Sequence, residues 1–217
     1  MVWIVDGTGQ IQHRHRSWHQ QLRISVFTAH GRGESEVLAI PQWDTASTVT
    51  ESFTLPSFLY LPEEAVATQI RGRGLSCGEW AAGRLAQRKA SETPGRVAHS
   101  AKSWLCHHAA DRSAPFLPWG SDDLTQREKI SPVFALALTL KHLRAAWDAR
   151  FAGQGQGFQF DTQEITITVP ASFGAAAHAC CRAGSGLPRS HASAPGAAGG
   201  FLPFAGTTRW PQRSAVA

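Results

Sequence analysis

Only one stretch of the chain carries a long helical pattern of apolar positions. Large apolar residues recur there at spacings of 4, 3, 4 and 4: Leu136, Leu140, Leu143, Trp147 and Phe151. Such spacing places one continuous apolar stripe on a helix. Ser131 is suited to cap the first turn, Pro132 to occupy it, and the run "GQGQG" (153–157) to end it. The pattern predicts a helix that starts after Ser131 and ends near residue 152.

Shorter apolar runs before and after this helix predict strands. The run "VWIV" leads into the tight turn "DGTG", and "LRISVFT" alternates like a half-buried strand. The segments "SEVLAIPQ" and "SFTLPSFLYLP" read as extended and as stopped by their prolines. In "EITITVPASF", three β-branched residues share one face before Pro170. Strands are therefore expected within residues 2–5, 22–28, 35–42, 52–62 and 165–169.

Further helices and an irregular tail complete the expected organisation. Helices are expected over 77–90, over 96–105 ("RVAHSAKSWL") and in the alanine-rich segment after "PASF". A buried strand that runs into a helix is the βα step of an α/β domain. After about Gly184 the chain is rich in Gly, Ala, Ser and Pro and loses all periodicity. We expect one folded domain over 1–184 and an irregular or disordered tail over 185–217.

Composition narrows the class of protein. The chain has 217 residues and a formal net charge of +5, and its basic residues are scattered rather than gathered in a stripe. This argues against a nucleic-acid partner. No apolar run reaches 18 residues, so no membrane partner is expected, and the first residues lack the basic leader of a signal peptide. These features favour a cytoplasmic protein.

Motifs for several other chemistries are missing from the sequence. The four cysteines form no CxxC pair, and Cys106, His107 and His108 have no second ligand pair at zinc-finger spacing. No GxSxG elbow is present, and the glycines of "RGRGLSCGEW" lack the lysine of a P-loop. Reduced, structural thiols are therefore expected, and a Ser–His–Asp hydrolase is disfavoured.

Lys102, in the short half-apolar segment "GRVAHSAKSWLCHH" (95–108), leaves two alternatives open. Its aliphatic stem could pack on the helix while its ammonium reaches water, which is common for lysines on amphipathic helices. It could instead face a phosphate in a nucleotide pocket. Nothing within these fourteen residues decides between the two alternatives.

The order of these motifs resembles one known family. The "DGT" turn, "TLPSFLYLP", "GRVAHSAKSWL", the helix opened by "ISP", and "TVPASF" together resemble the nucleotide-binding domain of the heat-shock-70 (DnaK-type) chaperones, in their divergent bacterial branch. The resemblance is strongest over residues 35–184. It implies an α/β fold, namely part of an actin-like ATPase (ribonuclease-H-like) lobe with a helical subdomain.

The resemblance also implies roles for five positions. Asp6, Gly7 and Thr8 match the first phosphate loop, with Asp6 next to a hydrated Mg²⁺. Lys102 matches the catalytic lysine that reaches the γ-phosphate and the attacking water. Pro170 matches the proline that couples nucleotide state to the rest of the chaperone. ATP and Mg²⁺ are the implied cofactors, and unfolded polypeptides or co-chaperones are the implied partners.

The sequence also departs from the family. It lacks the second half of the nucleotide-binding domain, so weak or no ATPase activity is expected from this chain alone. The codons that can encode residues 197–204, read one base later, can spell the Glu-Pro-Gln-Ala-Ala-Phe-Tyr segment that the family carries after "VPASF" and its helix. We therefore interpret the tail as the product of a shifted reading frame.

The alternative function is a non-catalytic interaction module, for which Trp104 and Trp119 near proline-rich loops are the candidate surface.

Overall fold

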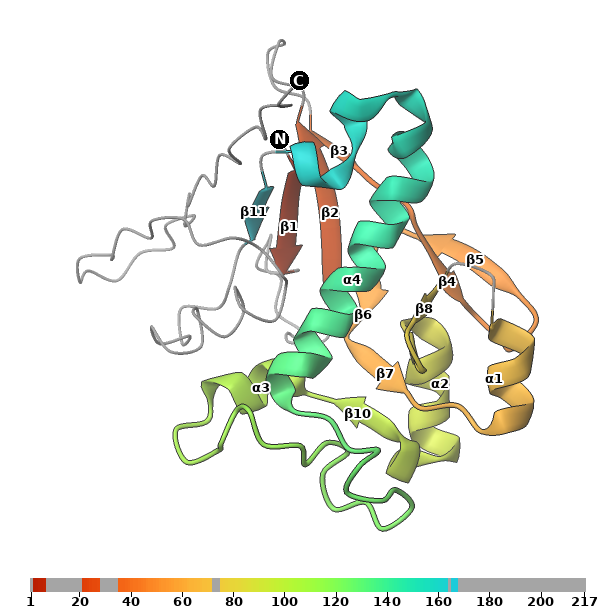
Figure 1. Ribbon diagram of the computed structural model, residues 1–217, viewed down its shortest axis with the longest axis vertical. Coiled ribbons are helices and arrows are strands. Elements are labelled where there is room, and N and C mark those ends of the chain that lie inside the picture. The colour runs from red at the N-terminus through yellow and green to blue at the C-terminus, as the bar shows by residue number, and fades with distance from the viewer. Residues whose placement is uncertain (1, 7–20, 28–34, 72–74, 164, 168–217) are drawn as a thin grey trace, which may run out of the picture.

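A computed structural model gives the fold as a mixed arrangement of small, mainly antiparallel sheets and helices (Figure 1). It describes residues 2–6, 21–27, 35–71, 75–163 and 165–167. The predicted alanine-rich helix and the expected tail over 185–217 lie outside these residues. The longest helix crosses the middle of the molecule in Figure 1.

The first sheet joins the two ends of the described chain. Its strands are β1 (Val2–Asp6), β2 (Gln21–Phe27), β3 (Ser35–Val37) and β11 (Ile165–Ile167), in the order β11-β1-β2-β3, and β6 (Leu55–Pro56) also pairs with β2. The pair of β1 with β11 is parallel, whereas β1 with β2, β2 with β3 and β2 with β6 are antiparallel. The strands predicted at the start of the chain, at 22–28 and at 165–169 are confirmed in the described residues.

Two further sheets lie between β3 and the long helix in the sequence. One is antiparallel, in the order β10-β7-β9-β8, with bounds β7 (Phe58–Tyr60), β8 (Ser76–Cys77), β9 (Trp80–Ala82) and β10 (Val97–His99). The other is a hairpin of β4 (Ile40–Trp43) and β5 (Val49–Ser52). The residues of β7 and β9 are buried on both faces of their sheet and contribute to two different apolar clusters.

Four α-helices are described, and the longest is the predicted one. They are α1 (Glu64–Ile70), α2 (Arg84–Glu92), α3 (Ala101–Cys106) and α4 (Pro132–Phe151). Short 3₁₀ turns occupy Pro94–Arg96, Ala152–Gln154, Gln156–Phe158 and Phe160–Thr162. The hydroxyl of Ser131 accepts a hydrogen bond from the Phe134 backbone N–H at 3.1 Å, as expected of an N-cap.

Helix α4 packs into two apolar clusters at once. Leu140 and Leu143 join Leu22 and Ile24 of β2 in one cluster, whereas Leu138 joins residues of β7, β9 and β10 in the other. This explains why α4 is apolar beyond a single stripe, since a helix between two cores buries more than one face. The helix therefore fixes the first sheet relative to the second.

Three sequence predictions about elements are wrong. The helix expected over 77–90 begins only at Arg84, because Trp80 lies in β9 and is buried in the second sheet. The helix expected over 96–105 is split, since β10 precedes α3. Proline does not stop the first extended segment, because Pro41 lies within β4; the second ends just before Pro62, although Pro56 lies within β6. Both strands are short and lie at or near sheet edges, where a missing N–H is tolerated.

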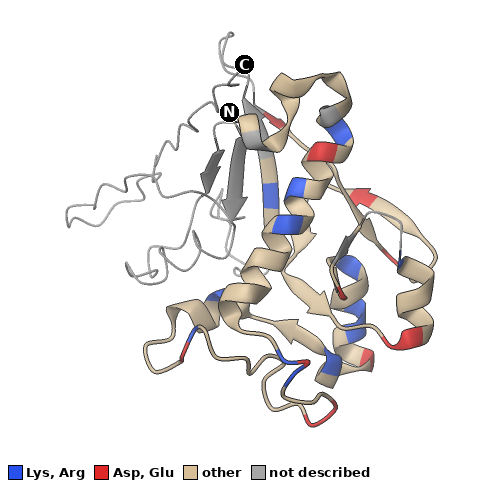
Figure 2. Ribbon diagram, in the orientation of Figure 1, with Lys and Arg blue, Asp and Glu red and all other residues tan. Residues whose placement is uncertain are grey.

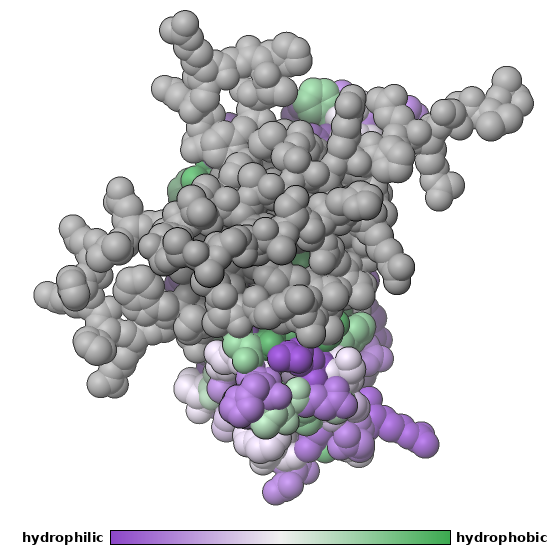
Figure 3. Space-filling model, turned by 90° about the vertical axis from the view of Figure 1, so that its left-hand side faces the viewer, coloured by the Kyte–Doolittle hydropathy of each residue, from purple (hydrophilic) through white to green (hydrophobic). Residues whose placement is uncertain are grey.

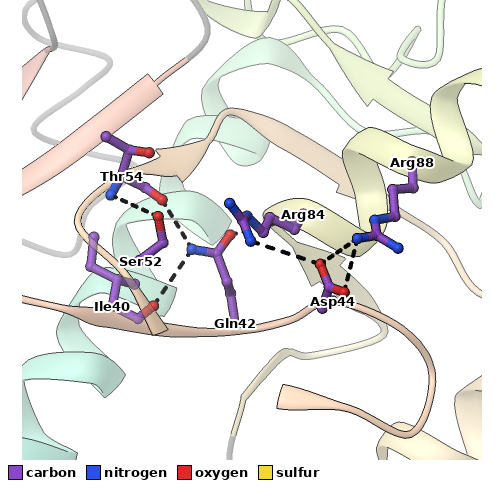
Figure 4. A network of polar contacts seen from close by, with 7 residues as sticks. All are labelled: Ile40, Gln42, Asp44, Ser52, Thr54, Arg84 and Arg88. Carbon is purple, nitrogen blue, oxygen red and sulfur yellow. Dashed lines mark hydrogen bonds and ion pairs between the residues drawn. The ribbon is translucent and has the colours of Figure 1, made fainter. Parts of the chain in front are cut away.

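The side-chain amide of Gln42 joins three parts of the chain (Figure 4). Gln42 is 0% exposed; its Nε2 donates to the Thr54 carbonyl at 2.9 Å, and its Oε1 accepts from the Arg84 backbone N–H at 3.0 Å. Arg84 is the first residue of α2, and Gly83 before it has no side chain to serve as a cap. Gln42 thus satisfies one of the unpaired N–H groups at the start of α2.

An ion pair next to this amide makes a second, more exposed link between β4 and α2. Both carboxylate oxygens of Asp44 accept from Nη2 of Arg88, at 2.8 and 2.9 Å, and Arg84 lies 3.9 Å from the same carboxylate (Figure 4). The arginine side chains are about half exposed, so this pair contributes less than the buried amide does.

His142 makes a buried link between α4 and β4. It is 2% exposed, and its Nε2 lies 2.9 Å from the Pro41 carbonyl, to which it donates as Nε2–H. Burial lowers the pKa of His142, against the opposing effect of its hydrogen bonds to backbone. The imidazole is therefore held neutral in the core.

Gly83→Ala should destabilise the fold strongly. A Cβ at this position would lie 2.6 Å from Gln42 Oε1 and 2.9 Å from Leu55 Cδ1, at a φ of +94°. We expect a loss of about 2–4 kcal/mol in the free energy of unfolding, measured by urea denaturation. Gly120→Ala is the matched control, because its φ is +67° and its Cβ would meet nothing within 4 Å. Equal losses in the two variants would contradict a steric role for Gly83.

His142→Gln should flatten the pH dependence of stability. Because the folded pKa of His142 is lowered, the unfolded chain takes up the proton first as the pH falls below about 6.5. The free energy of unfolding of the wild type then decreases, by up to about 1.4 kcal/mol per pH unit, and this contribution is fully present above that pH. Denaturation of both proteins across this range measures the difference. The exposed His108→Gln is the control, and parallel curves for wild type and His142→Gln would refute the prediction.

Candidate functional site

Lys102 lies on the short helix α3 and points its side chain into the protein. It is 4% exposed, and its neighbours Ala101 and Leu105 on the same helix are buried too. The helix starts after Ser100, whose φ of 58° is left-handed. The alternative in which the Lys102 ammonium reaches open water is therefore wrong, because burial leaves almost none of the residue in contact with solvent.

Helix α3 packs at the end of the first sheet where β1 ends. Leu105 belongs to the same apolar cluster as Leu22 and Ile24 of β2. Leu22 is the residue that pairs with Asp6 in the antiparallel register of β1 and β2. In Figure 1 the arrow of β1 likewise points toward the end of the molecule that carries α3. The helix of Lys102 and the last residue of β1 therefore lie at the same end of this sheet.

The other predicted site residues are only partly described. Asp6 is the last residue of β1, and its backbone alone is described. Gly7 and Thr8, which follow it, lie outside the described residues, as does Pro170, which follows β11. The strands β1 and β11 pair in parallel, so both finish at the same end of the sheet.

Three aromatic side chains form a cluster on and beside α3, and two of them, Trp104 and Phe116, also pack against the second apolar cluster. We call Trp104, Phe116 and Trp119 the aromatic cluster. The ring centroids of Trp104 lie 5.0 Å from Trp119 and 5.1 Å from Phe116, and those of Phe116 and Trp119 lie 5.6 Å apart. Trp119 is 68% exposed, whereas Trp104 and Phe116 are half-buried. The two tryptophans singled out in the sequence thus meet, and one of them faces solvent.

Sequence reasoning missed Phe116 and the contact of His107 with this cluster. His107 lies 5.6 Å from Trp104, and His108 stacks on His107 at 5.2 Å with an interplanar angle of 10°. The available signal was the closeness of "WLCHH" to the aromatic-proline run "PFLPW" in the sequence. Nothing in residue spacing alone brings a loop residue onto a helix.

The surface of the described residues is mixed in charge. Helices α2 and α4 each carry three basic residues and one acidic residue, whereas the loops carry both signs (Figure 2). On the face toward the left-hand side of Figure 1, hydrophobic and hydrophilic side chains are interspersed at the end that carries α3 (Figure 3).

Among the described residues, no group of three His, Cys, Asp or Glu side chains could hold a metal ion, and Cys106, His107 and His108 form no such group. Within the same residues, no helix has the length and apolar character needed to cross a bilayer.

Comparison with known proteins does not assign the chain to a family. No family model matches the chain, and no curated protein matches it significantly. The candidate site therefore rests on its own residues: a buried lysine on α3, the end of β1 at the same end of the first sheet, and the aromatic cluster that includes Trp104 of the same helix.

Proposed function

We propose that this chain is an ATP-binding protein of the heat-shock-70 type, in which Lys102 faces the phosphates of a bound nucleotide. The burial of Lys102 is the observation that carries the proposal, since it holds the amino group of this lysine inside the protein rather than in solvent. A triphosphate supplies the negative charge and the acceptor oxygens that such an ammonium favours. In phosphoryl transfer, a positive group so placed stabilises the developing charge.

The sheet supports an actin-like, ribonuclease-H-like lobe. Its order β11-β1-β2-β3, with one parallel pair beside an antiparallel meander, is compatible with that fold. In the proposal, Asp6, Gly7 and Thr8 form the phosphate turn, with Asp6 oriented to a hydrated Mg²⁺. Pro170 couples the nucleotide to unfolded polypeptides or co-chaperones. The location of α3 at the β1 end of the sheet is consistent with such a site.

Hydrolysis by this chain alone should be slow or absent. The residues proposed here supply one wall of a phosphate site, whereas a complete clamp closes on the nucleotide from two sides. Each missing charge-assisted hydrogen bond removes about 1.5–3 kcal/mol. Two such losses weaken binding by about a hundredfold or more, since a tenfold change is about 1.4 kcal/mol. We therefore propose nucleotide binding, rather than rapid turnover, as the activity to test.

The aromatic cluster favours a second candidate function, a protein-interaction module without catalysis. Trp119 is 68% exposed and Phe134, in the first turn of α4, is 51% exposed. Aromatic side chains of this kind are enriched where proteins bind one another. The two functions differ in a simple observable, because only the first requires a response to nucleotide.

Lys102→Met should remove the response to MgATP while it preserves the apolar stem of the side chain. At a hundredfold excess of ligand over its Kd, a nucleotide that binds only the folded state adds about 2.7 kcal/mol, which raises the melting temperature. We expect this rise in the wild type and in Lys141→Ala, an exposed lysine of α4, but not in Lys102→Met. The same rise in all three proteins would exclude Lys102 as a phosphate contact, and no rise in any would exclude nucleotide binding.

Trp119→Ala tests the interaction module. If the aromatic cluster binds a second molecule of this chain, the wild type should sediment faster as its concentration rises, and the variant should associate about tenfold more weakly. Phe158→Ala is the control, because Phe158 is also exposed but lies outside the cluster. Sedimentation velocity measures both. Association that is equal in the two variants, or absent from the wild type, would argue against this surface as a self-association site.

A further inference from the structure

Strand β5 has one edge that no described strand pairs with. It pairs with β4 on one side, and within the described residues these two strands form a sheet of their own. The backbone N–H of Asp44 donates to the Thr48 carbonyl at 2.9 Å, so these two facing residues form a hydrogen-bonded pair. Bonded and non-bonded pairs alternate along an antiparallel ladder, which places Val49 and Glu51 in non-bonded pairs. Their backbone N–H and C=O groups therefore point away from β4.

The facing strand has the same geometry. Pro41 lies opposite Glu51 and has no N–H to donate, yet the hairpin stays paired because this position makes no hydrogen bond across it. The Pro41 carbonyl also points away from β5, since it accepts the Nε2–H of His142 at 2.9 Å. On β5, in contrast, no partner outside β4 uses the backbone groups of Val49 or Glu51 in the described part of the chain. This edge of β5 is therefore open to a further strand.

The side chains along the open edge are apolar on either side of one carboxylate. Val49 is 40% exposed, and Phe53, directly after β5, is 62% exposed. Glu51 lies between them, is exposed, and forms no ion pair within the described residues. Natural edge strands are commonly protected by lysine or proline, and β5 contains neither. Unpaired backbone groups beside exposed side chains are the features by which a sheet edge binds an extended peptide.

We propose that β5 binds an extended segment of another protein as an added strand, and that Glu51 selects a segment with a lysine or arginine opposite it. The outward N–H and C=O groups of Val49 and Glu51 supply the backbone hydrogen bonds. Residues two positions before and after the basic residue lie on the same face of the added strand. They meet Val49 and Phe53, so they are apolar. The recognised pattern is apolar-x-basic-x-apolar, which is the same in a parallel and in an antiparallel strand.

The carboxylate of Glu51 disfavours a second copy of this chain as the occupant. The antiparallel register that pairs residues 49–53 completely with their copy places Glu51 opposite Glu51 of the other molecule. Like charges directly opposite each other destabilise a strand pair, whereas opposite charges stabilise it. One side chain therefore both disfavours self-association at this edge and attracts a basic partner.

Binding of two labelled peptides to the full chain, measured by fluorescence anisotropy without nucleotide, tests the proposal. One peptide is Thr-Val-Thr-Lys-Thr-Val-Thr, and the other has Glu in place of Lys. We expect the wild type to bind the Lys peptide about five- to tenfold more tightly, because its central pair with Glu51 is attractive rather than repulsive. The formal net charge of the chain, +5, favours the Glu peptide instead, so overall charge does not produce this preference.

Four variants separate the charge from the backbone edge. Glu51→Lys should reverse the preference, and Asp122→Lys, which changes an exposed carboxylate in the loop before α4, should keep it. Glu51→Gln should bind the two peptides equally. Glu51→Pro should bind both at least fivefold more weakly than Glu51→Gln, because proline also removes an outward N–H. Its melting temperature should match that of Glu51→Gln, since this N–H makes no bond to β4.

Equal affinity of the wild type for the two peptides, or binding of neither, would overturn the proposal. Peptide binding that is the same in Glu51→Pro and Glu51→Gln would overturn it as well. Self-association of the wild type that Glu51→Pro abolishes would assign the edge to a second copy instead. Strand β5 and helix α3 lie well apart in Figure 1, and the assay contains no ATP. The result is therefore independent of whether the chain binds nucleotide.

Discussion

The buried amide of Gln42 is the interaction on which the arrangement of the smaller elements depends. It is the point where β4, the connection before β6 and the start of α2 meet, and it uses both its donor and its acceptor there. Loss of either atom would leave a backbone group unsatisfied in the interior, at about 1–3 kcal/mol each. This hydrogen bonding also requires glycine at position 83, because a Cβ there would overlap the amide oxygen of Gln42. The first turn of α2 is thus capped by Gln42, a residue more than forty positions earlier in the sequence.

Helix α4 connects this part of the structure to the first sheet. Through His142 it is tied to the Pro41 carbonyl, next to Gln42 in β4, and through Leu140 and Leu143 it packs on β2. Because one helix packs in both cores, it holds the two sheets together, beside the short connection that joins β6 of the first sheet to β7 of the second. Helix α3 packs on this frame, so the position of Lys102 is a consequence of α4 packing as much as of its own six residues.

The sequence predicts those elements whose stability is mainly local. The leucine spacing and the Ser131 cap of α4 are visible in the sequence, and so is the alternation of β2. The helix predicted over 77–90 is wrong in its first half, because alanines and Trp80 suit a helix as well as a strand. Pairing with β7 makes residues 80–82 a strand, and the helix begins only after Gly83. Lys102 could be singled out by its apolar neighbours. The aromatic cluster could not, since Phe116 and Trp119 reach Trp104 only through the fold.

The two candidate functions meet on a single element. Lys102 and Trp104 are two residues apart on α3, which places them on opposite faces of a helix, one buried and one turned to the aromatic cluster. A helix of six residues has little freedom to move one face without the other. A partner that shifts the backbone of α3 through Trp104 therefore also shifts Lys102, and a phosphate that shifts it through Lys102 also shifts Trp104. By the reciprocity of linked equilibria, binding at either face would change the affinity at the other by the same factor.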